Sequence, residues 1–419
     1  MEASLFFEQL LGVKAPWRIT RVTQDADLHR VDLFVEHYPG IRFPCPKCET
    51  FCPIYDHTAE REFRHLNTCQ FATYIHVRIP RIHCATDGVQ QIVHGLAEPN
   101  ATVTYEFERA VLDLEQECSL ESVCRLLQLD WHLAFRLQEE AVVRGKARKA
   151  KGIPARFGVD EKSFAKGHRY ETIIYDLDRG TVESVHEDRK QESLEAYYQG
   201  FSPEERAQVE AIAMDMWDPY IAATKAYIPG AEKKIVFDRY HVMRLVVDAV
   251  DKVRKAEHRA LQQKGDDTLK GTKYLWLWNE ENIPDYRREE FEQFRHLDLK
   301  VGRARALKEN LRHMWDYSSP GWMRRYFQDW YIWATHSRLP PMVRAARSLK
   351  NHLENIVTYA KHHITNALGE SLNSKIEKVK RLACGYRNRD HYRTAIYFHC
   401  SGLDLYPKRT SLPSQIITA

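Results

Sequence analysis

The chain has 419 residues, and its 62 Lys and Arg residues nearly balance its 58 Asp and Glu residues, so the formal net charge of +4 does not by itself indicate a nucleic-acid partner. A hydrophobic content of 43% with 29% charged residues is typical of a soluble globular protein, and the length predicts about two to four domains. No apolar run reaches the roughly 18 residues of a membrane helix, and the acidic N-terminal segment lacks the basic start of a signal peptide, so we expect a cytosolic protein.

Residues 1–100 are expected to form a β-rich module. Ser4–Leu11 predicts a short helix, and Val31–Val35 alternates apolar and polar residues as a half-buried strand does. The same alternation recurs over residues 71–79. The module therefore combines one helix with several strands.

A cysteine knuckle, Cys45-Pro-Lys-Cys48, places two thiolates where they can share one metal ion, for which zinc is the usual choice. The odd total of nine cysteines also favours a metal over a disulfide framework. Cys84 and Asp87 repeat the spacing and complete a candidate zinc set of four ligands. Rival ligands are Cys52, Cys69 and His83. The alternative is a metal-free β module that has kept some cysteines.

Residues 105–143 predict three helices, because apolar residues recur at helical spacing. Ser119 can cap the second helix and Asp130 the third, and the short link between these helices has the spacing of a helix-turn-helix. The third helix would then present a set of side chains to the DNA major groove, namely Trp131, His132, Phe135, Arg136 and Gln138. A plain helical bundle linking two domains is the alternative.

A basic run follows these helices, with five cations in eight residues: Arg144, Lys146, Arg148, Lys149 and Lys151. Such a run can follow a DNA phosphate backbone, although many charge runs are solvated linkers.

From residue 156 the pattern changes to strands. Phe157–Val159 is a short apolar run, and Asp160 is expected where that strand leaves the core. A carboxylate there needs a metal, a cation or solvent, because burying it unpaired is costly. An aspartate that caps a turn is the simpler explanation of Asp160 taken alone.

The elements after Asp160 follow a recognisable order. Two strands joined by a hairpin come first, and then helices alternate with two more strands; the expected ranges are 170–175, 181–186, 192–198 (helix), 211–215, 219–226 (helix) and 234–237. This is the order of the ribonuclease-H-like fold. Its first and fourth strands are neighbours, so Asp160 and Asp215 would lie together.

The remainder is predominantly helical. Residues 242–355 predict a helical region rich in tryptophan, whose rings we expect in the core: Trp276, Trp278, Trp315, Trp322, Trp330 and Trp333. Residues 356–382 predict one further helix with a polar stripe made of Asn366, Glu370, Asn373 and Glu377, flanked by the cations Lys375, Lys378, Lys380 and Arg381. Acceptors among cations suit a site for metal and phosphate, and a solvated face is the alternative.

Four segments make the chain resemble the bacterial insertion-sequence transposases of the ISL3 family: RHLNTCQFATYIHVRIPRIHC, the Asp160 strand, IVFDRYH and HHITNALGESLNSKIEKVKRLACGYRNRDHYRTAIYFHC. The resemblance implies a catalytic triad of Asp160, Asp215 and Glu370. It also implies accessory roles for Asp238 and His241, which place DNA or brace the site, and the polar stripe adds Asn366 and Asn373. Related sequences commonly carry His or Cys where this chain has Asp87, so the fourth zinc ligand departs from the family.

The expected architecture is a multidomain α/β protein with five parts. These are a zinc-ribbon-like β module (1–100), a helix-turn-helix with the basic linker (101–151), the first part of a ribonuclease-H-like core (152–241), an all-helical insertion (242–355), and the end of the core with the third acidic residue (356–419).

The triad makes chemical sense as a site for two Mg²⁺ ions about 4 Å apart, with Mn²⁺ as an alternative ion. Water would attack the phosphodiester at the element's end, and the freed 3′-hydroxyl would then attack target DNA. Expected partners are the terminal inverted repeats, target DNA and further copies of the chain in a homodimer or larger oligomer, in the bacterial cytoplasm and on the nucleoid. Contacts to DNA are expected from Trp131, His132, Arg136, the basic run, Lys375, Lys378 and Arg381.

Two other functions fit the same residues. One is a DNA-binding regulator derived from a transposase and without catalysis, and the other is a nuclease that cuts without joining. Glu161 and Asp218 are neighbouring carboxylates that could be mistaken for members of the triad.

Overall fold

The computed structural model describes residues 3–165, 169–364 and 367–408. The chain forms two compact units, one made of residues 1–149 with 378–419 and the other of residues 150–377. Both units contain helices and strands. Along the chain, the N-terminal region is rich in strands and the C-terminal part is mainly helical. Among the described residues, no helix is both long enough and apolar enough to span a membrane.

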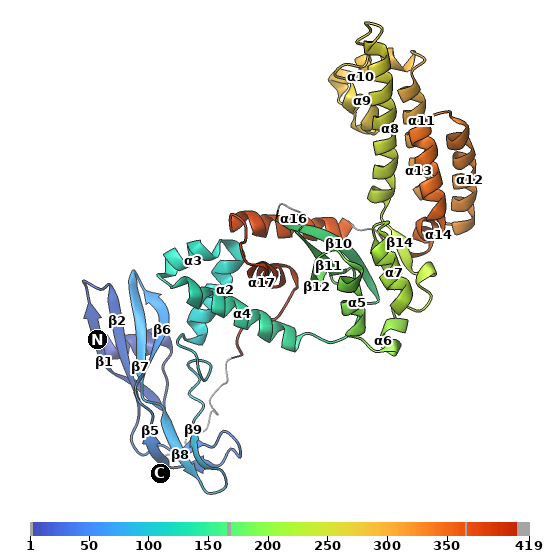
Figure 1. Cartoon of the computed structure of the whole chain (residues 1–419). Helices are drawn as coiled ribbons and strands as arrows, with labels where there is room; N and C mark the ends of the chain where they lie inside the picture. Colours follow the sequence, from blue (N-terminus) through green and yellow to red (C-terminus); the bar gives the residue numbers. More distant parts are fainter. Residues whose placement is uncertain (1–2, 166–168, 365–366, 409–419) are drawn as a thin grey trace. The chain divides into compact units, whose positions relative to one another are not determined.

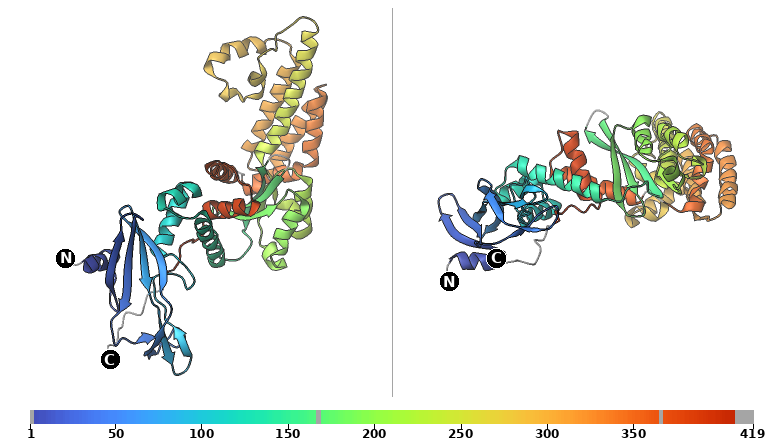
Figure 2. Two further views of the ribbon diagram at one scale, coloured as in Figure 1. Left: turned by 60° about the vertical axis from the view of Figure 1, so that its left-hand side comes forward. Right: turned by 90° about the horizontal axis from the view of Figure 1, so that it is seen from below.

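The first unit begins with a four-stranded sheet. Its order is β1 (Trp17–Asp25), β2 (Arg30–His37), β7 (Phe71–Val77) and β6 (Arg61–Thr68), with β2 and β7 parallel and the other pairs antiparallel. The helix α1 (Ala3–Leu11) packs against β1 (Figure 2). Leu33 and Phe63 are fully buried under the sheet. The predicted first helix and the strand at 31–35 are confirmed.

Two small sheets carry the cysteine loops. One pairs β3 (Phe43–Pro44) with β4 (Phe51–Cys52), and the other has the order β5 (Ile54–His57), β8 (Pro80–Cys84) and β9 (Gly88–Gln91). The knuckle follows β3. In the second ligand pair, Cys84 ends β8 and Asp87 lies in the turn before β9. These short strands therefore bring two distant segments of sequence together.

Three helices follow, α2 (Tyr105–Glu117), α3 (Leu120–Leu127) and α4 (Trp131–Arg148). The side chains of Ser119 and Asp130 accept hydrogen bonds from backbone N–H groups of the next turn, so both predicted caps are confirmed. Gln128 ends α3 in the left-handed conformation (φ 54°), and only residues 128–130 separate the two helices. The helix α4 continues past its predicted end, so most of the basic run is helical.

The last described segment returns to α4. The helix α17 (Arg389–Cys400) packs on α4, and the chain then runs on past its C-terminal turns. Arg144 donates to the Leu405 carbonyl (2.6 Å) and Arg148 to the Tyr406 carbonyl (2.6 Å). A Cβ atom added at Gly145 would lie 2.6 Å from the Leu403 Cβ, so a side chain there would force Leu403 away.

The second unit is built on a five-stranded sheet. Its order is β12 (Thr181–Glu187), β11 (Arg169–Asp176), β10 (Arg156–Ala165), β13 (Ala211–Met214) and β14 (Ile235–Phe237). The first three strands are antiparallel, and β10, β13 and β14 are parallel. The strands β10 and β13 are neighbours, as the order of elements predicted.

One boundary prediction is wrong. We expected the strand to leave the core at Asp160, but β10 continues to Ala165 and pairs with β11 throughout. Its pairing with β13 covers Arg156–Gly158, because β13 ends at Met214. Asp160 therefore lies inside a strand, just beyond the part that is paired on both sides.

Four short helical segments accompany the sheet: α5 (Gln191–Gln199), α6 (Pro203–Ala207), α7 (Asp218–Tyr227) and the 3-10 turn η1 (Ala231–Lys233). Leu194 and Tyr198 of α5 are fully buried in the same core as Phe157 and Ile212 of the sheet. The sequence predicted α5 and α7 but not α6, which is one turn long and opens with a capping box at Ser202.

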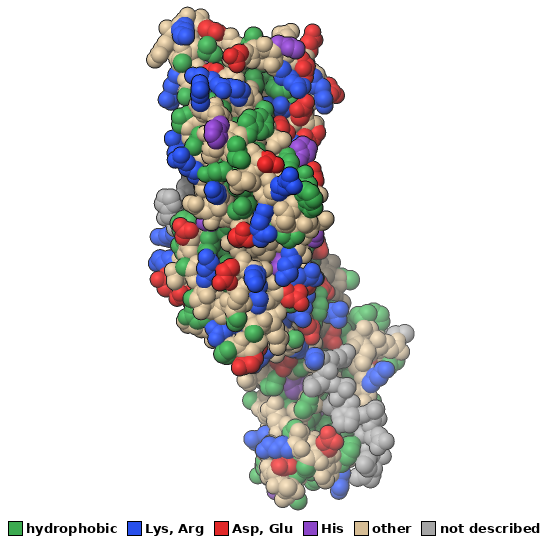
Figure 3. Space-filling view, turned by 90° about the vertical axis from the view of Figure 1, so that its right-hand side faces the viewer, with side chains coloured by type: hydrophobic (Ala, Val, Ile, Leu, Met, Phe, Trp, Pro, Cys, Tyr) green, Lys and Arg blue, Asp and Glu red, His purple; other side chains and the backbone are tan. Residues whose placement is uncertain are grey.

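A region of long helices follows β14. It comprises α8 (Arg239–Gln262), α9 (Lys273–Leu277), η2 (Glu280–Asn282), α10 (Asp285–Arg295), α11 (Lys300–Arg312), η3 (His313–Asp316), α12 (Pro320–His336), α13 (Pro340–Asn351) and α14 (Leu353–Val357). Figure 1 shows α8, α11, α12 and α13 side by side, and Figure 3 shows Lys and Arg side chains interspersed with acidic and apolar ones on one face of this region.

The tryptophans of this region do not all pack in the core. Trp276, Trp315 and Trp330 are buried as expected, whereas Trp322 is 58% and Trp333 46% exposed. The predicted helix over 356–382 is also interrupted, because α14 is followed by the short α15 (Tyr359–His362), and α16 (Ala367–Leu382) begins later. His363, in the left-handed conformation (φ 49°), ends α15.

Candidate functional site

Three aspartates line up at one edge of the second unit's sheet. Gly158 of β10 pairs with Ala213 of β13 in parallel register, so Asp160 and Asp215 each follow two residues later on neighbouring strands. Met214 pairs with Phe237 in the same way, which places Asp238 beside Asp215. The carboxyl ends of parallel strands meet at one edge of a sheet, so these three carboxylates share that edge.

Asp160 is held by hydrogen bonds from two directions. Its Oδ1 accepts from the backbone N–H of Glu161 (2.7 Å), and its Oδ2 accepts from the Asn373 side-chain amide of α16 (2.7 Å). Asn373 in turn accepts from the Tyr175 hydroxyl of β11 (2.7 Å). The amide therefore bridges β10 and β11 and fixes α16 to the sheet. Figure 1 labels these three elements.

The polar stripe of α16 partly lies against β10. One turn after Asn373, Glu377 forms an ion pair with Lys162 of β10 (3.5 Å). Glu370 precedes Asn373 by three residues, and residues so spaced share one face of a helix. Its side chain is exposed. Asn366 lies outside the described residues.

The charges around Asp160 are largely negative. Burial raises the pKa of Asp160, and the charge of Asp215 adds to this, while the Glu161 N–H group opposes it. The Nε2 atom of His241 lies 2.8 Å from the Asp215 Oδ1. Burial alone would lower the pKa of His241, but the carboxylates of Asp215, Asp238 and Asp160 outweigh burial and raise it.

The neighbouring carboxylates differ from Asp160 in their partners and in their exposure. Glu161 forms an ion pair with Arg189 (2.8 Å), a partner that sequence reasoning missed, and Asp218 is exposed at the start of α7. Asp238 is 7% exposed and caps α8 by accepting from the Tyr240 N–H. Asp160, Asp215 and His241 remain half-buried at the edge of the sheet.

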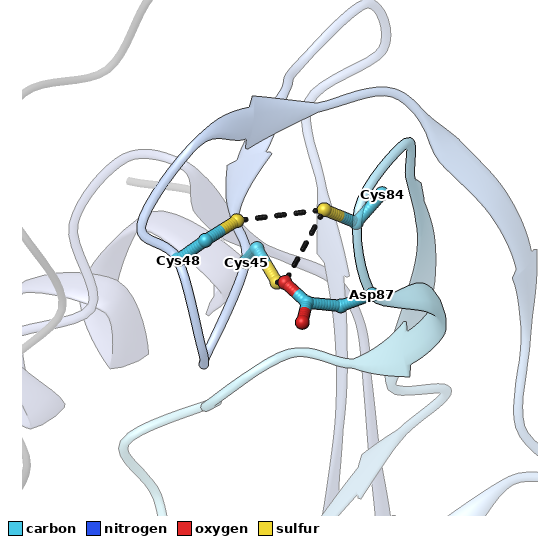
Figure 4. Close-up of side chains that lie close together, drawn as sticks. All are labelled: Cys45, Cys48, Cys84 and Asp87. Atoms are coloured by element: carbon cyan, nitrogen blue, oxygen red, sulfur yellow. Dashed lines mark hydrogen bonds between the residues drawn. The ribbon is translucent and has the colours of Figure 1, made fainter.

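The cysteine cluster of the first unit is compact. The ligand atoms of Cys45, Cys48, Cys84 and Asp87 all lie within 4.8 Å of one another, and Figure 4 shows them converging from two loops. The Cys45 Sγ is 3.3 Å from an Asp87 oxygen, and the Cys48 and Cys84 sulfurs are 3.5 Å apart. Three thiols and one carboxylate are a donor set that suits tetrahedral zinc.

The rival ligands lie elsewhere. Cys52 donates its thiol hydrogen to the Thr50 carbonyl, Cys69 is exposed in the turn between β6 and β7, and His83 is exposed. In the part of the chain that the structure describes, none of these three belongs to the metal-type cluster. The cluster fits one structural metal ion.

Comparison with known families adds the decisive observation. Residues 157–396, more than half of the chain, match the ISL3 family model described as "Transposase". The chain belongs to the ISL3 family of DDE transposases. Residues 42–87, which contain the cysteine cluster, match the model described as "zinc-finger of transposase IS204/IS1001/IS1096/IS1165".

Individual relatives cover most of the chain. The transposase for insertion sequence element IS1001 of Bordetella parapertussis is 26% identical over 353 residues, which are 83% of this chain and 86% of the relative. The transposase for insertion sequence element IS1557 of Mycobacterium tuberculosis is 26% identical over 374 residues, 82% of each chain. Membership of a transposase family makes DNA the expected partner.

The residues of α4 that were predicted to face DNA point in two directions. His132 and Arg136 are exposed. Trp131 and Phe135 instead stack on each other (5.2 Å between ring centres), and the Phe135 ring lies 4.1 Å from His391 of α17. Two of the five predicted groove-facing side chains therefore stack within the protein, and the prediction is wrong for Gln138, which is only 6% exposed.

Several side chains of the basic run already contact other residues of the protein. Arg144 forms an ion pair with the buried Glu108 (2.7 Å), and Arg148 with Asp404 (3.1 Å). The Lys146 Nζ lies 3.1 Å from the centre of the Tyr397 ring, and burial lowers the pKa of Lys146 to about 8. The remaining predicted cations are Lys149, which is half-buried, and Lys151, Lys375, Lys378 and Arg381, which are exposed.

Proposed function

We propose that this transposase cuts DNA at the terminal inverted repeats of its insertion sequence and joins the ends to target DNA, using a ribonuclease-H-like core interrupted by the helical region. The alignment of Asp160 with Asp215 on neighbouring parallel strands carries the proposal. The hydrogen bond from Asn373 supports Glu370 as the third member, because it fixes α16 beside Asp160.

Asp160, Asp215 and Glu370 would hold two Mg²⁺ ions. They fit the ion by the chemistry of their donors, since Mg²⁺ prefers a few carboxylate oxygens together with water and phosphate oxygens. The bound ions would lower the pKa of the attacking water and stabilise the leaving oxygen. The charge of Asp215 raises the pKa of Asp160, so a divalent ion would relieve the repulsion between the two carboxylates.

The surrounding residues would act as positioning residues. Tyr175 and Asn373 fix the direction of the Asp160 carboxylate, which also accepts a hydrogen bond from the Glu161 N–H group. His241 holds Asp215, and Asp238 anchors the start of α8. These hydrogen bonds would restrict rotation of the carboxylates. Loss of a contact that orients a metal ligand typically lowers activity by about 10- to 100-fold.

Recognition of base edges would lie in the first unit. We propose α3 and α4 as a helix-turn-helix, with His132 and Arg136 reaching base edges and the exposed cations of α16 and Lys151 contacting phosphates. The cysteine cluster would hold zinc as a structural ion. Cutting and joining two ends would be performed by a homodimer or larger oligomer in the bacterial cytoplasm.

The test is cleavage of a labelled element end, measured beside a gel shift with the same DNA. Asp160→Asn, Asp215→Asn and Glu370→Gln should each lower cleavage and strand transfer by at least ~10³-fold, because metal ligation supplies several kcal/mol of transition-state stabilisation. Each variant should still bind the repeat. Asp218→Asn is the matched control and should cut normally, since Asp218 is exposed outside the aligned edge.

Two results would contradict the proposal. Cleavage at the wild-type rate by Glu370→Gln would remove Glu370 from the site and make Glu377 the next candidate, although Glu377 is paired with Lys162. Repeat binding by the wild type with no cleavage in either Mg²⁺ or Mn²⁺ would favour the regulator derived from a transposase.

A further inference from the structure

A cavity of about 340 Å³ lies in the first unit, between α4 and the segment that joins α16 to α17. Pockets for small ligands begin at roughly 300 Å³, so it can hold a single planar ring system. Its lining includes the stacked rings of Trp131, Phe135 and His391, together with Val379 and Tyr386. We call this cavity the ring pocket.

The ring pocket also contains buried polar groups. Glu115 is 1% and Gln138 is 6% exposed, and both line the cavity. Within the described residues, neither carboxyl oxygen of Glu115 has a hydrogen-bond partner of good geometry. Burial raises the pKa of Glu115 to about 8, and the Gln138 amide offsets only part of this. At neutral pH the carboxyl therefore keeps its proton and offers one donor and one acceptor.

These features narrow the chemistry of the ligand. A purely apolar ligand would leave the Glu115 carboxyl unsatisfied, at a cost of about 1–3 kcal/mol. A flat ring with its own donors and acceptors satisfies both the ring wall and the buried polar pair.

We propose that the ring pocket receives one unpaired nucleobase of the DNA substrate, with the attached phosphate at the exposed Arg387. This inference rests on the proposed function, which makes DNA the substrate. Stacking of a base on an aromatic side chain contributes about 1–3 kcal/mol, and Trp131, at 38% exposure, offers part of its surface. Taking a base out of a duplex costs a few kcal/mol, least where the base is already unpaired.

The experiment uses the full-length protein without divalent ions, so that binding is measured without cleavage. Terminal-repeat duplexes that carry one extra unpaired base, moved position by position, are compared with the flush duplex. At one position the affinity should rise by about 5- to 150-fold, which corresponds to one stacked base. Trp131→Ala should abolish this gain, measured as the ratio of the affinities of the same variant for the bulged and the flush duplex.

Three further arms make the result decisive. Trp322→Ala removes an exposed tryptophan of the helical region and should keep the gain. Glu115→Gln should keep the gain but change which base is preferred, a result that a purely structural role would not produce. Free deoxynucleosides should compete with the unpaired base but not with the flush duplex, which places no base in the pocket. An excess is needed because the tethered base has a higher effective concentration.

Several outcomes would overturn the inference. These are equal affinity for bulged and flush duplexes at every position, an equal loss on both duplexes in Trp131→Ala, or displacement of the flush duplex by free nucleosides. Failure of the wild type to bind the flush terminal repeat would instead remove the proposed function itself, and this inference with it.

Discussion

The cysteine cluster and the aligned aspartates are assembled in opposite ways. The cluster draws its ligands from two tight turns within residues 45–87, and its four ligand atoms lie within 4.8 Å of one another. The aspartates come from strands that are 55 residues apart in the chain, and Glu370 follows after the whole helical region. The first is a closed group of side chains, and the second is an open edge of a sheet.

The difference matches the two uses of a metal ion that we propose for these sites. Four converging ligands leave no place for a substrate, which is typical of a structural ion. Carboxylates along an open edge leave coordination positions for water and phosphate, which is what catalysis requires. We therefore expect loss of the first metal to damage the fold and loss of the second to stop chemistry in an intact protein.

The strongest test of this contrast removes the knuckle. Cys45→Ser with Cys48→Ser should abolish zinc binding and unfold the small sheets around residues 43–91, because structural zinc contributes on the order of 10 kcal/mol in small zinc domains. Metal analysis and hydrogen exchange measure the two effects. Cys69→Ser is the control, since Cys69 is exposed outside the cluster. Full protection of β8 amides in a zinc-free double variant would contradict a structural role for the metal at the cysteine cluster.

A smaller effect is expected at Asp87, the one carboxylate among three thiol ligands. Asp87→Ala should weaken zinc binding by roughly 100-fold, whereas Asp87→Cys should restore or exceed wild-type affinity, because thiolates are good zinc ligands. Competition with a chromogenic chelator gives both affinities. Unchanged affinity in Asp87→Ala would mean that the Asp87 contact at 3.3 Å from Cys45 is not a ligand contact.

On the catalytic side, Asn373→Ala should lower cleavage by about 10- to 100-fold without changing the affinity for terminal repeats. The amide fixes the Asp160 carboxylate, and Tyr175→Phe should give a milder defect of the same kind. Ser374→Ala is the neighbouring control, because its hydroxyl bonds to the Glu370 carbonyl of its own helix. Equal rates for the Asn373 and Ser374 variants would contradict the positioning role.

The smallest effect concerns Glu115, a buried carboxyl that stays neutral by keeping its proton. Its pKa is raised from 4.5 to about 8 in the folded chain, so between these pH values the unfolded chain loses a proton that the folded chain keeps. Stability therefore falls as pH rises through this window. Glu115→Gln should gain on the order of 2 kcal/mol relative to wild type between pH 5 and pH 8.

Hydrogen exchange of α2 amides, compared between variant and wild type at each pH, measures this change. Glu117→Gln on the same helix is exposed and should show no such trend. A constant difference between Glu115→Gln and wild type across the window would mean that Glu115 is ionised in the folded protein.

Local signals in the sequence predicted local structure well. Ser119 and Asp130 cap their helices, and the knuckle spacing located the cysteine cluster, because each depends on a few neighbouring residues. The order of strands also gave the neighbouring positions of β10 and β13. The triad and its metals remain predictions, since alignment of strands is not evidence of catalysis.

Features that depend on distant partners escaped the sequence. The pairing of β10 with β11 extends the strand past Asp160, and contacts with residues 401–406 support α4 beyond its predicted end. Trp322 and Trp333 have the same chemistry as the buried Trp330, so composition could not distinguish them. Arg189 and Tyr175 carried no motif, because their roles arise from contacts across the sheet.

The close contact at Gly145 has a consequence for how the protein is made. The carbonyl that Arg144 binds lies 261 residues further along the chain. A ribosome adds about 5–20 residues per second, so roughly 13–50 s pass between synthesis of α4 and synthesis of its support. During this interval the nascent helix has neither α17 nor residues 401–406 against it. In a chain released early, α4 would therefore lack this support. The surface proposed to read DNA would be supported only in molecules that also contain the whole five-stranded sheet.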